Sequence, residues 1–143
     1  MTEVLTGGCL CGGVRYEVTE PPVKATYCHC TRCQRRTGTA VSAQARLVPG
    51  SLRIVEGKEL VQAWQPEDGF AKCFCSRCGG ALWSVGAGGE VWSVRLGTFD
   101  SDPGVRPSHR QYVAYAAVWE PIPDDGLPRF PERLPAEAVP PTS

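Results

Sequence analysis

The chain has 143 residues, the length of about one typical domain. Its 15 basic and 15 acidic side chains give a formal net charge of zero, which argues against a nucleic-acid-binding protein, because such proteins usually carry a basic excess. No apolar run approaches the ~20 residues that span a bilayer, and the first residues lack the features of a signal peptide, so we expect a cytoplasmic protein without membrane or nucleic-acid partners.

The residue pattern indicates a mainly β domain. Sixteen glycines and 13 prolines make turns frequent and disfavour long helices. Apolar and polar residues alternate over 14–19, as in a half-buried strand. A short helix is expected after Cys30, with Thr31 as its N-cap. Further strands are expected at 60–64, 81–85, 91–96 and 112–118, with the glycine-rich residues 86–90 closing a hairpin.

We expect one domain over residues 1–134 and a flexible tail over 135–143, because the tail is proline-rich and lacks aromatic residues. Residues 121–131 are also proline-rich but retain large apolar side chains, which indicates an extended arm packed on the domain. The four tryptophans are assigned to the core: Trp64, Trp83, Trp92 and Trp119.

Eight cysteines fall into three groups: Cys9 and Cys11; Cys28, Cys30 and Cys33; and Cys73, Cys75 and Cys78. Without a secretory signal, clustered cysteines indicate metal binding or catalysis rather than disulfides. The pattern C-x-C-[ST]-R-C occurs at 28–33 and again at 73–78, so two similar turns could hold two similar ions. Buried free thiols and redox pairs are the alternatives to metal binding.

The number of cysteines separates two candidate sites. Zinc prefers four ligands in a tetrahedron, and catalytic zinc usually has three protein ligands and one open position. Cys9 and Cys11 together with Cys75 and Cys78 would complete a structural site, whereas the cysteines at 28, 30 and 33 leave one position open. The alternative is that Cys73 or His109 closes the second site, which would make both sites structural.

Four segments resemble one known family. They are G-G-C-L-C-G-G-V-R-Y at 7–16, C-H-C-T-R-C-Q-R-R-T-G at 28–38, F-C-S-R-C-G-G-A-L-W at 74–83, and W-E-P-I-P-D-D-G-L-P-R-F at 119–130, which follows His109. In this order they resemble the glutathione-dependent formaldehyde-activating enzyme (Gfa) family, which shares a domain with centromere protein V. The resemblance covers residues 5–131 and implies a small Mss4-like, tent-shaped β fold of antiparallel sheets that holds zinc.

The resemblance also implies the roles of the cysteines. It implies two zinc ions, one structural and one catalytic or labile. Cys73 matches no ligand of the family. The structural ligands would be Cys9, Cys11, Cys75 and Cys78. The ligands of the second zinc, which we also assign as the catalytic residues, would be Cys28, Cys30 and Cys33.

The activity implied by the resemblance is that of a zinc-dependent carbon–sulfur lyase or synthase. It would join a small thiol such as glutathione to an aldehyde such as formaldehyde, giving S-(hydroxymethyl)glutathione, or act on a related adduct. Arg32, Arg35 and Arg36 could bind the carboxylates of glutathione, although for any single arginine we favour the alternative that it is solvated or offsets the negative charge of the zinc–thiolate centres. His29 and His109 are expected to be structural. The alternative functions are a non-catalytic zinc-stabilised binding domain and a redox- or metal-sensing thiol protein.

Overall fold

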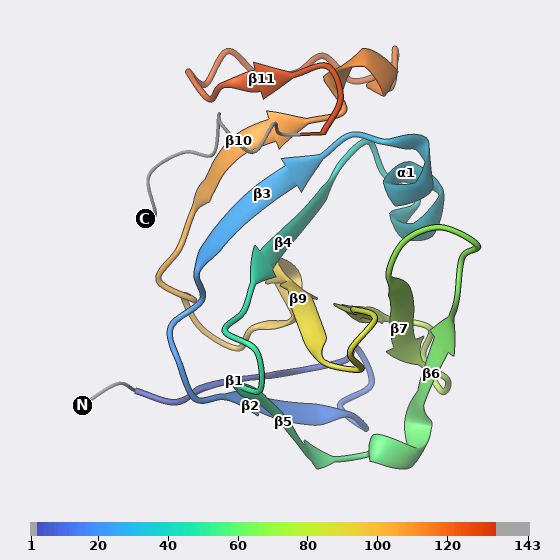
Figure 1. Ribbon diagram of the computed structural model, residues 1–143, viewed down its shortest axis with the longest axis vertical. Helices are drawn as coiled ribbons and strands as arrows, with labels where there is room; N and C mark the ends of the chain where they lie inside the picture. Colours follow the sequence, from blue (N-terminus) through green and yellow to red (C-terminus); the bar gives the residue numbers. More distant parts are fainter. Residues whose placement is uncertain (1–2, 134–143) are drawn as a thin grey trace.

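The computed structural model describes residues 3–133, which form two β-sheets and one short α-helix (Figure 1). The predicted tail over 135–143 lies outside the described residues. The smaller sheet contains, in spatial order, β1 (Leu5–Gly8), β2 (Arg15–Val18) and β5 (Leu52–Glu56). The larger sheet contains, in spatial order, β11 (Arg129–Phe130), β10 (Pro107–Gln111), β3 (Lys24–Cys28), β4 (Ser42–Arg46), β9 (Val91–Arg95), β8 (Ala81–Val85), β7 (Ala71–Cys75) and β6 (Val61–Trp64).

The mainly β fold confirms the prediction, but the sheets are not entirely antiparallel. β10 pairs in parallel with both β3 and β11, whereas the other strand pairs are antiparallel. The long connection over residues 112–128 allows β11 to lie parallel to β10, because parallel neighbours need a crossover rather than a tight hairpin. Within the described part of the chain the larger sheet stays open, with β11 and β6 at its edges.

The hydrophobic core joins the two sheets. Tyr16 on β2 is fully buried, and its ring meets the ring of Trp83 on β8 edge-on, with 5.9 Å between centroids. The Tyr16 hydroxyl and Thr98 Oγ1 are 2.7 Å apart, so the polar end of this buried ring is satisfied. The alternation predicted for this segment therefore fixes the smaller sheet against the larger one.

Two predictions about apolar residues are wrong. Residues 112–118 do not form a buried strand: Tyr112 adopts a left-handed conformation with φ of 60°, the chain turns, and Val113–Tyr115 form a 3-10 helix (η3). Val118 beyond it is fully exposed. Trp64 and Trp119 are also largely exposed, whereas Trp83 is in the core. A run of apolar residues without a period of two carried no information about which face was buried.

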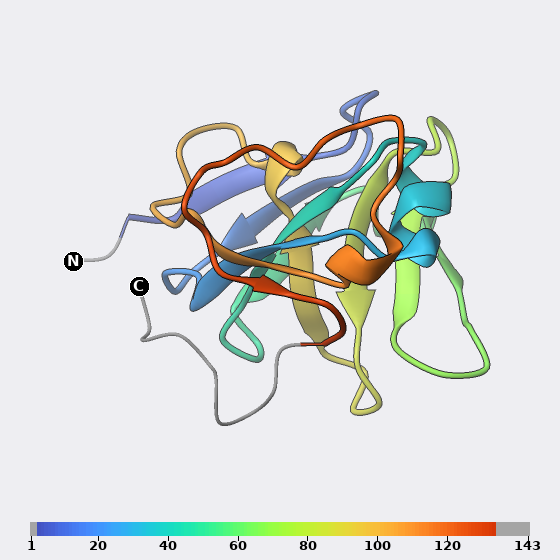
Figure 2. The same cartoon turned by 90° about the horizontal axis from the view of Figure 1, so that it is seen from above.

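The C-terminal arm packs on the domain as predicted. It passes over β3 and β10 and ends in β11 (Figure 2). The Phe130 ring meets the His109 ring edge-on at 5.8 Å between centroids. The remaining short elements are α1 (Thr31–Thr37), η1 (Lys58–Leu60) and η2 (Leu96–Thr98). No helix among residues 3–133 has the length and apolar character needed to span a membrane.

Candidate metal centres

Four cysteine sulfurs meet where the β1–β2 loop approaches the β7–β8 turn. The four-cysteine cluster consists of Cys9, Cys11, Cys75 and Cys78, whose sulfurs lie within 4.8 Å of one another. The Cys9 and Cys11 sulfurs are 3.6 Å apart, and those of Cys11 and Cys75 are 3.9 Å apart. A tetrahedral zinc with Zn–S bonds near ~2.3 Å requires sulfur separations of about 3.8 Å. The donor set and its spacing therefore fit a four-coordinate zinc ion.

Glycines allow the backbone to approach these sulfurs. A side chain at Gly13 would place a Cβ 3.3 Å from the Cys11 sulfur and 2.7 Å from Leu60 Cδ1. Gly79, with φ of 76°, donates its backbone N–H to the Cys75 carbonyl at 2.7 Å and closes the second turn. Backbone hydrogen bonds from Gly80 and Cys11 lower the pKa of the Cys78 thiol to about 6. The β7–β8 turn therefore favours, at Cys78, the thiolate that a metal ligand requires.

The second group comes from one continuous segment at the end of β3. The three-cysteine cluster consists of Cys28, Cys30 and Cys33, whose sulfurs also lie within 4.8 Å of one another. Cys28 ends β3 and Cys33 lies in the first turn of α1; both are buried. Cys30, not the predicted Thr31, is the N-cap of α1, and its sulfur accepts the Cys33 N–H at 3.3 Å. A single strand-to-helix turn thus gathers all three sulfurs.

Charge in the three-cysteine cluster is unevenly distributed. Hydrogen bonds from Cys28 and Cys30, followed by Ser42 and the charge of Arg36, lower the pKa of the Cys33 thiol. Hydrogen bonds to Cys30 and Cys33, together with burial, raise the pKa of Cys28. Arg36 Nη2 lies 3.6 Å from the Cys33 sulfur. The guanidinium beside the Cys33 sulfur therefore favours a negative charge there.

A cavity of about 970 Å³ opens over the three-cysteine cluster. Its wall includes all three cysteines of this cluster and none of the four-cysteine cluster. Seven basic side chains line the cavity, against two carboxylates, Asp68 and Glu132. The basic residues are Lys24, Arg32, Arg36, Arg46, Lys72, Arg95 and Arg133. The three-cysteine cluster thus faces an accessible space with a basic lining.

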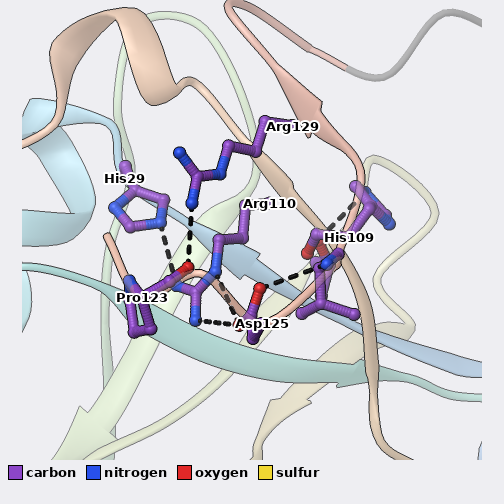
Figure 3. A network of polar contacts seen from close by, with 8 residues as sticks. His29, His109, Arg110, Pro123, Asp125 and Arg129 are labelled. Carbon is purple, nitrogen blue, oxygen red and sulfur yellow. Dashed lines mark hydrogen bonds and ion pairs between the residues drawn. The ribbon is translucent and has the colours of Figure 1, made fainter. Parts of the chain in front are cut away.

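A polar network around the buried Arg110 connects His29, which lies between two cysteines of the three-cysteine cluster, to the C-terminal arm (Figure 3). Arg110 on β10 is buried, and its guanidinium donates to Asp125 at 2.8 Å and lies 3.2 Å from His29 Nε2. Arg110 also lies over the Tyr27 ring, 4.2 Å from its centroid, and Arg129 donates to the Pro123 carbonyl. His29 therefore points away from the neighbouring cysteine sulfurs and fixes the segment that carries them.

The two residues considered as a fourth ligand have other neighbours. His109 lines the cavity, but its Nε2 is 3.0 Å from Thr26 Oγ1 and its Nδ1 is 3.0 Å from Ser108 Oγ. Burial and the charge of Lys24 lower the pKa of His109. Cys73 lies in the hydrophobic core opposite Trp83, and burial raises its pKa. Neither residue belongs to a metal-competent group among the described residues.

The predicted arginines differ in their surroundings, and other basic residues were missed. Arg32 pairs with Asp68, Arg35 is exposed, and Arg36 reaches Cys33. Lys72 on β7 and Arg95 on β9 also line the cavity. The sequence gives little indication of this role, because the residue pattern of a strand does not predict which distant loop a basic side chain faces.

Comparison with known proteins identifies similar chains. Residues 4–115 match the model of the family described as "Glutathione-dependent formaldehyde-activating enzyme". A Halomonas elongata protein provisionally named as such an enzyme is 35% identical over 86 residues, which cover 56% of this chain and 55% of that relative. The matched region thus spans about half the length of that relative. A crystal structure of a Rhodobacter sphaeroides protein aligns with a TM-score of 0.51 and 27% identity, covering 87% of this chain and 98% of the other.

Proposed function

This chain belongs to the glutathione-dependent formaldehyde-activating enzyme family, and from that membership we propose that it is a zinc-dependent enzyme that forms or cleaves a carbon–sulfur bond. The proposed substrates are a small thiol such as glutathione and an aldehyde such as formaldehyde, and the adduct is S-(hydroxymethyl)glutathione. In this proposal one zinc is held by the four-cysteine cluster and is structural. A second zinc is held by the three-cysteine cluster, whose residues are catalytic.

One observation supports this division more than any other. The three-cysteine cluster faces the large cavity and offers three sulfur ligands, one fewer than the four-cysteine cluster. Among residues 3–133, no fourth cysteine, histidine or carboxylate completes that cluster. Three protein ligands and one exchangeable position are the usual arrangement of catalytic zinc, whereas four cysteines close a structural site.

The proposed reaction needs a thiolate, access for an aldehyde and a balanced proton transfer. A zinc ion held by Cys28, Cys30 and Cys33 would lower the pKa of a coordinated substrate thiol. The sulfur forms a bond to the carbonyl carbon while the C=O double bond becomes a single bond. The thiol loses one proton and the oxygen gains one, so the reaction requires no redox partner. Arg36 donates toward the Cys33 sulfur and offsets part of the thiolate charge.

The experiment combines a metal count with a rate measurement. Native mass spectrometry of the purified protein should find two zinc ions. Because glutathione adds to formaldehyde without a catalyst, NMR exchange between free glutathione and its adduct is the suitable assay. We expect faster exchange with the wild type and with Cys73→Ala, and the uncatalysed rate with Cys30→Ser. A zinc-loaded wild type that leaves the exchange rate unchanged would contradict the proposed activity.

A further inference from the structure

Three basic side chains beside the three-cysteine cluster have no acidic partner. Among residues 3–133, the ion pairs involve neither Arg36, Lys72 nor Arg95. By contrast, Arg32 in the same cavity pairs with Asp68, and Arg46 stacks on Trp92 with 4.1 Å to the ring centroid. Within the described part of the chain, Arg36, Lys72 and Arg95 therefore have no carboxylate to compensate their charge, and the same holds for Lys24 and Arg133 in the lining.

Lys72 and Arg95 converge on one hydroxyl. Arg95 Nη2 donates to Ser84 Oγ at 2.8 Å, and Lys72 Nζ lies 3.4 Å from the same oxygen. Arg95 is only 8% exposed, and its Nη1 reaches Gln44 Oε1 at 3.4 Å. Neutral oxygens thus orient these cations but do not neutralise them.

Several buried N–H groups in this region have no hydrogen-bond partner among residues 3–133. They are Nε of Arg95 and both Nε and Nη1 of Arg36. Burial and then the charge of Arg36 lower the pKa of Arg95 to about 10, and burial followed by the charges of Arg95 and Arg36 lowers that of Lys72. Buried like charges with unsatisfied donors are costly unless an anion joins them.

The thiolates of the three-cysteine cluster do not supply enough negative charge. Three thiolates with one divalent ion carry a single net negative charge, whereas the three cations carry three positive charges. Two positive charges therefore remain. Arg36 and Arg95 also border a smaller cavity of about 390 Å³, but Lys72, Ser84 and Gln44 line only the larger one. The surplus charge therefore lies on the side of the three-cysteine cluster.

We propose that Arg36, Lys72 and Arg95 form an anion subsite that holds a carboxylate of the thiol substrate beside the three-cysteine cluster. Guanidinium groups bind carboxylates through paired N–H donors, and a carboxylate would supply the negative charge that these three cations lack. This inference rests on the proposed function for the identity of the ligand. It makes carboxylate-bearing thiols the preferred substrate class and uncharged thiols poor substrates.

The test measures binding separately from catalysis. Isothermal titration calorimetry of the zinc-loaded protein would compare S-methylglutathione with its glycyl monoethyl ester and its diethyl ester. We expect the free acid to bind at least about tenfold more tightly than the diester. The monoester identifies which carboxylate is held, because only loss of that group reduces affinity. Binding of the free acid should weaken as the salt concentration rises.

Variants locate the subsite. Lys72→Met and Arg95→Gln should each weaken S-methylglutathione binding about tenfold and reduce the difference between acid and diester. Arg32→Gln is the matched control, because Asp68 already neutralises that cation, and it should change binding less than twofold. If Arg95→Gln does not fold, the binding measured with Lys72→Met tests the subsite. Equal affinity of acid and diester for the wild type, or absence of binding by the acid, would overturn the subsite.

These outcomes are separable from the proposed reaction. If the protein binds the free acid more tightly than the diester but does not accelerate exchange of the formaldehyde adduct, the anion subsite is supported and the proposed reaction is refuted. If exchange is accelerated and is equally fast for glutathione and glutathione diethyl ester, the proposed reaction is supported and the anion subsite is refuted.

Discussion

The four-cysteine and three-cysteine clusters use the same ligand atom but are assembled in opposite ways. The four-cysteine cluster joins two loops far apart in the sequence, and its Cys11 is exposed while Cys75 is fully buried. The three-cysteine cluster comes from one turn, is more buried, and nevertheless borders the large cavity. If the proposed function is right, the comparison teaches that reactivity depends on a free coordination position next to space for substrate, and not on the exposure of the cysteines.

The largest expected effect is the loss of the four-cysteine cluster. Cys11→Ser and Cys78→Ser each remove one proposed zinc ligand from the cluster in which the β1–β2 loop meets the β7–β8 turn. Structural zinc supplies apparent binding free energies of roughly 10 kcal/mol or more, comparable with the whole stability of a domain. We expect both variants to lose cooperative thermal unfolding, measured by circular dichroism. A melting temperature within a few degrees of that of the wild type would refute a structural role for this cluster.

Loss of the three-cysteine cluster should affect activity far more than stability. Cys30→Ser is a favourable test because serine is a good N-cap and can keep the cap of α1. We expect one zinc to be lost and the catalysed exchange rate to fall roughly 100-fold or more, with folding retained. Cys33→Ser should behave alike. The division between the clusters fails if these variants destabilise the domain as much as Cys11→Ser does.

A smaller effect is expected from the network that supports only the three-cysteine cluster. Asp125→Asn removes the carboxylate that accepts from buried Arg110, which in turn contacts His29. Because Asp125 is partly exposed, we expect only a small loss in the free energy of unfolding, measured with urea.

The same variant should change hydrogen exchange locally. The His29 amide, which donates to the Gln111 carbonyl at 3.0 Å, should exchange faster, while the Gly79 amide in the four-cysteine turn serves as the control. Equal acceleration at both amides would show that the network stabilises the whole domain and not this segment.

The smallest effect is expected at Cys73, which has the same place in the repeated pattern as Cys28 but lies in the core. Cys73→Ala or Cys73→Val should keep both zinc ions and cost about 1 kcal/mol or less, because only a small buried group changes. Native mass spectrometry and thermal melting provide the check. Release of one zinc by Cys73→Ala would mean that a fourth thiolate closes the second site.

The sequence predicted the strands with clear alternation and the grouping of the cysteines, because both depend on local spacing. The β2 pattern and the hairpin joining β8 to β9 are found as expected. Residues 112–118 misled the prediction because their composition suggested burial while a left-handed Tyr112 turned the chain to the surface.

The lining of the cavity could not be predicted in the same way. Arg95 is separated from the three-cysteine cluster by more than 60 residues, and its proximity results from the order of β4, β9 and β8 in the larger sheet. Spacing along the chain carries no information about this register. The local C-x-C-[ST]-R-C pattern likewise could not distinguish the proposed ligand Cys28 from the core residue Cys73, since both are its first cysteine. In the structure Cys28 ends β3, whereas Cys73 lies in the middle of β7.

Cobalt substitution tests most directly whether one cluster is open and the other closed. Sulfur-to-cobalt charge-transfer absorption reports the number of thiolates on each ion, so the protein should be loaded with Co²⁺ and titrated with glutathione. We predict that the absorption of the second ion rises as its thiolates increase from three to four, and that Cys30→Ser shows no such rise. A wild-type spectrum with both ions bound that does not respond to glutathione would contradict the central claim.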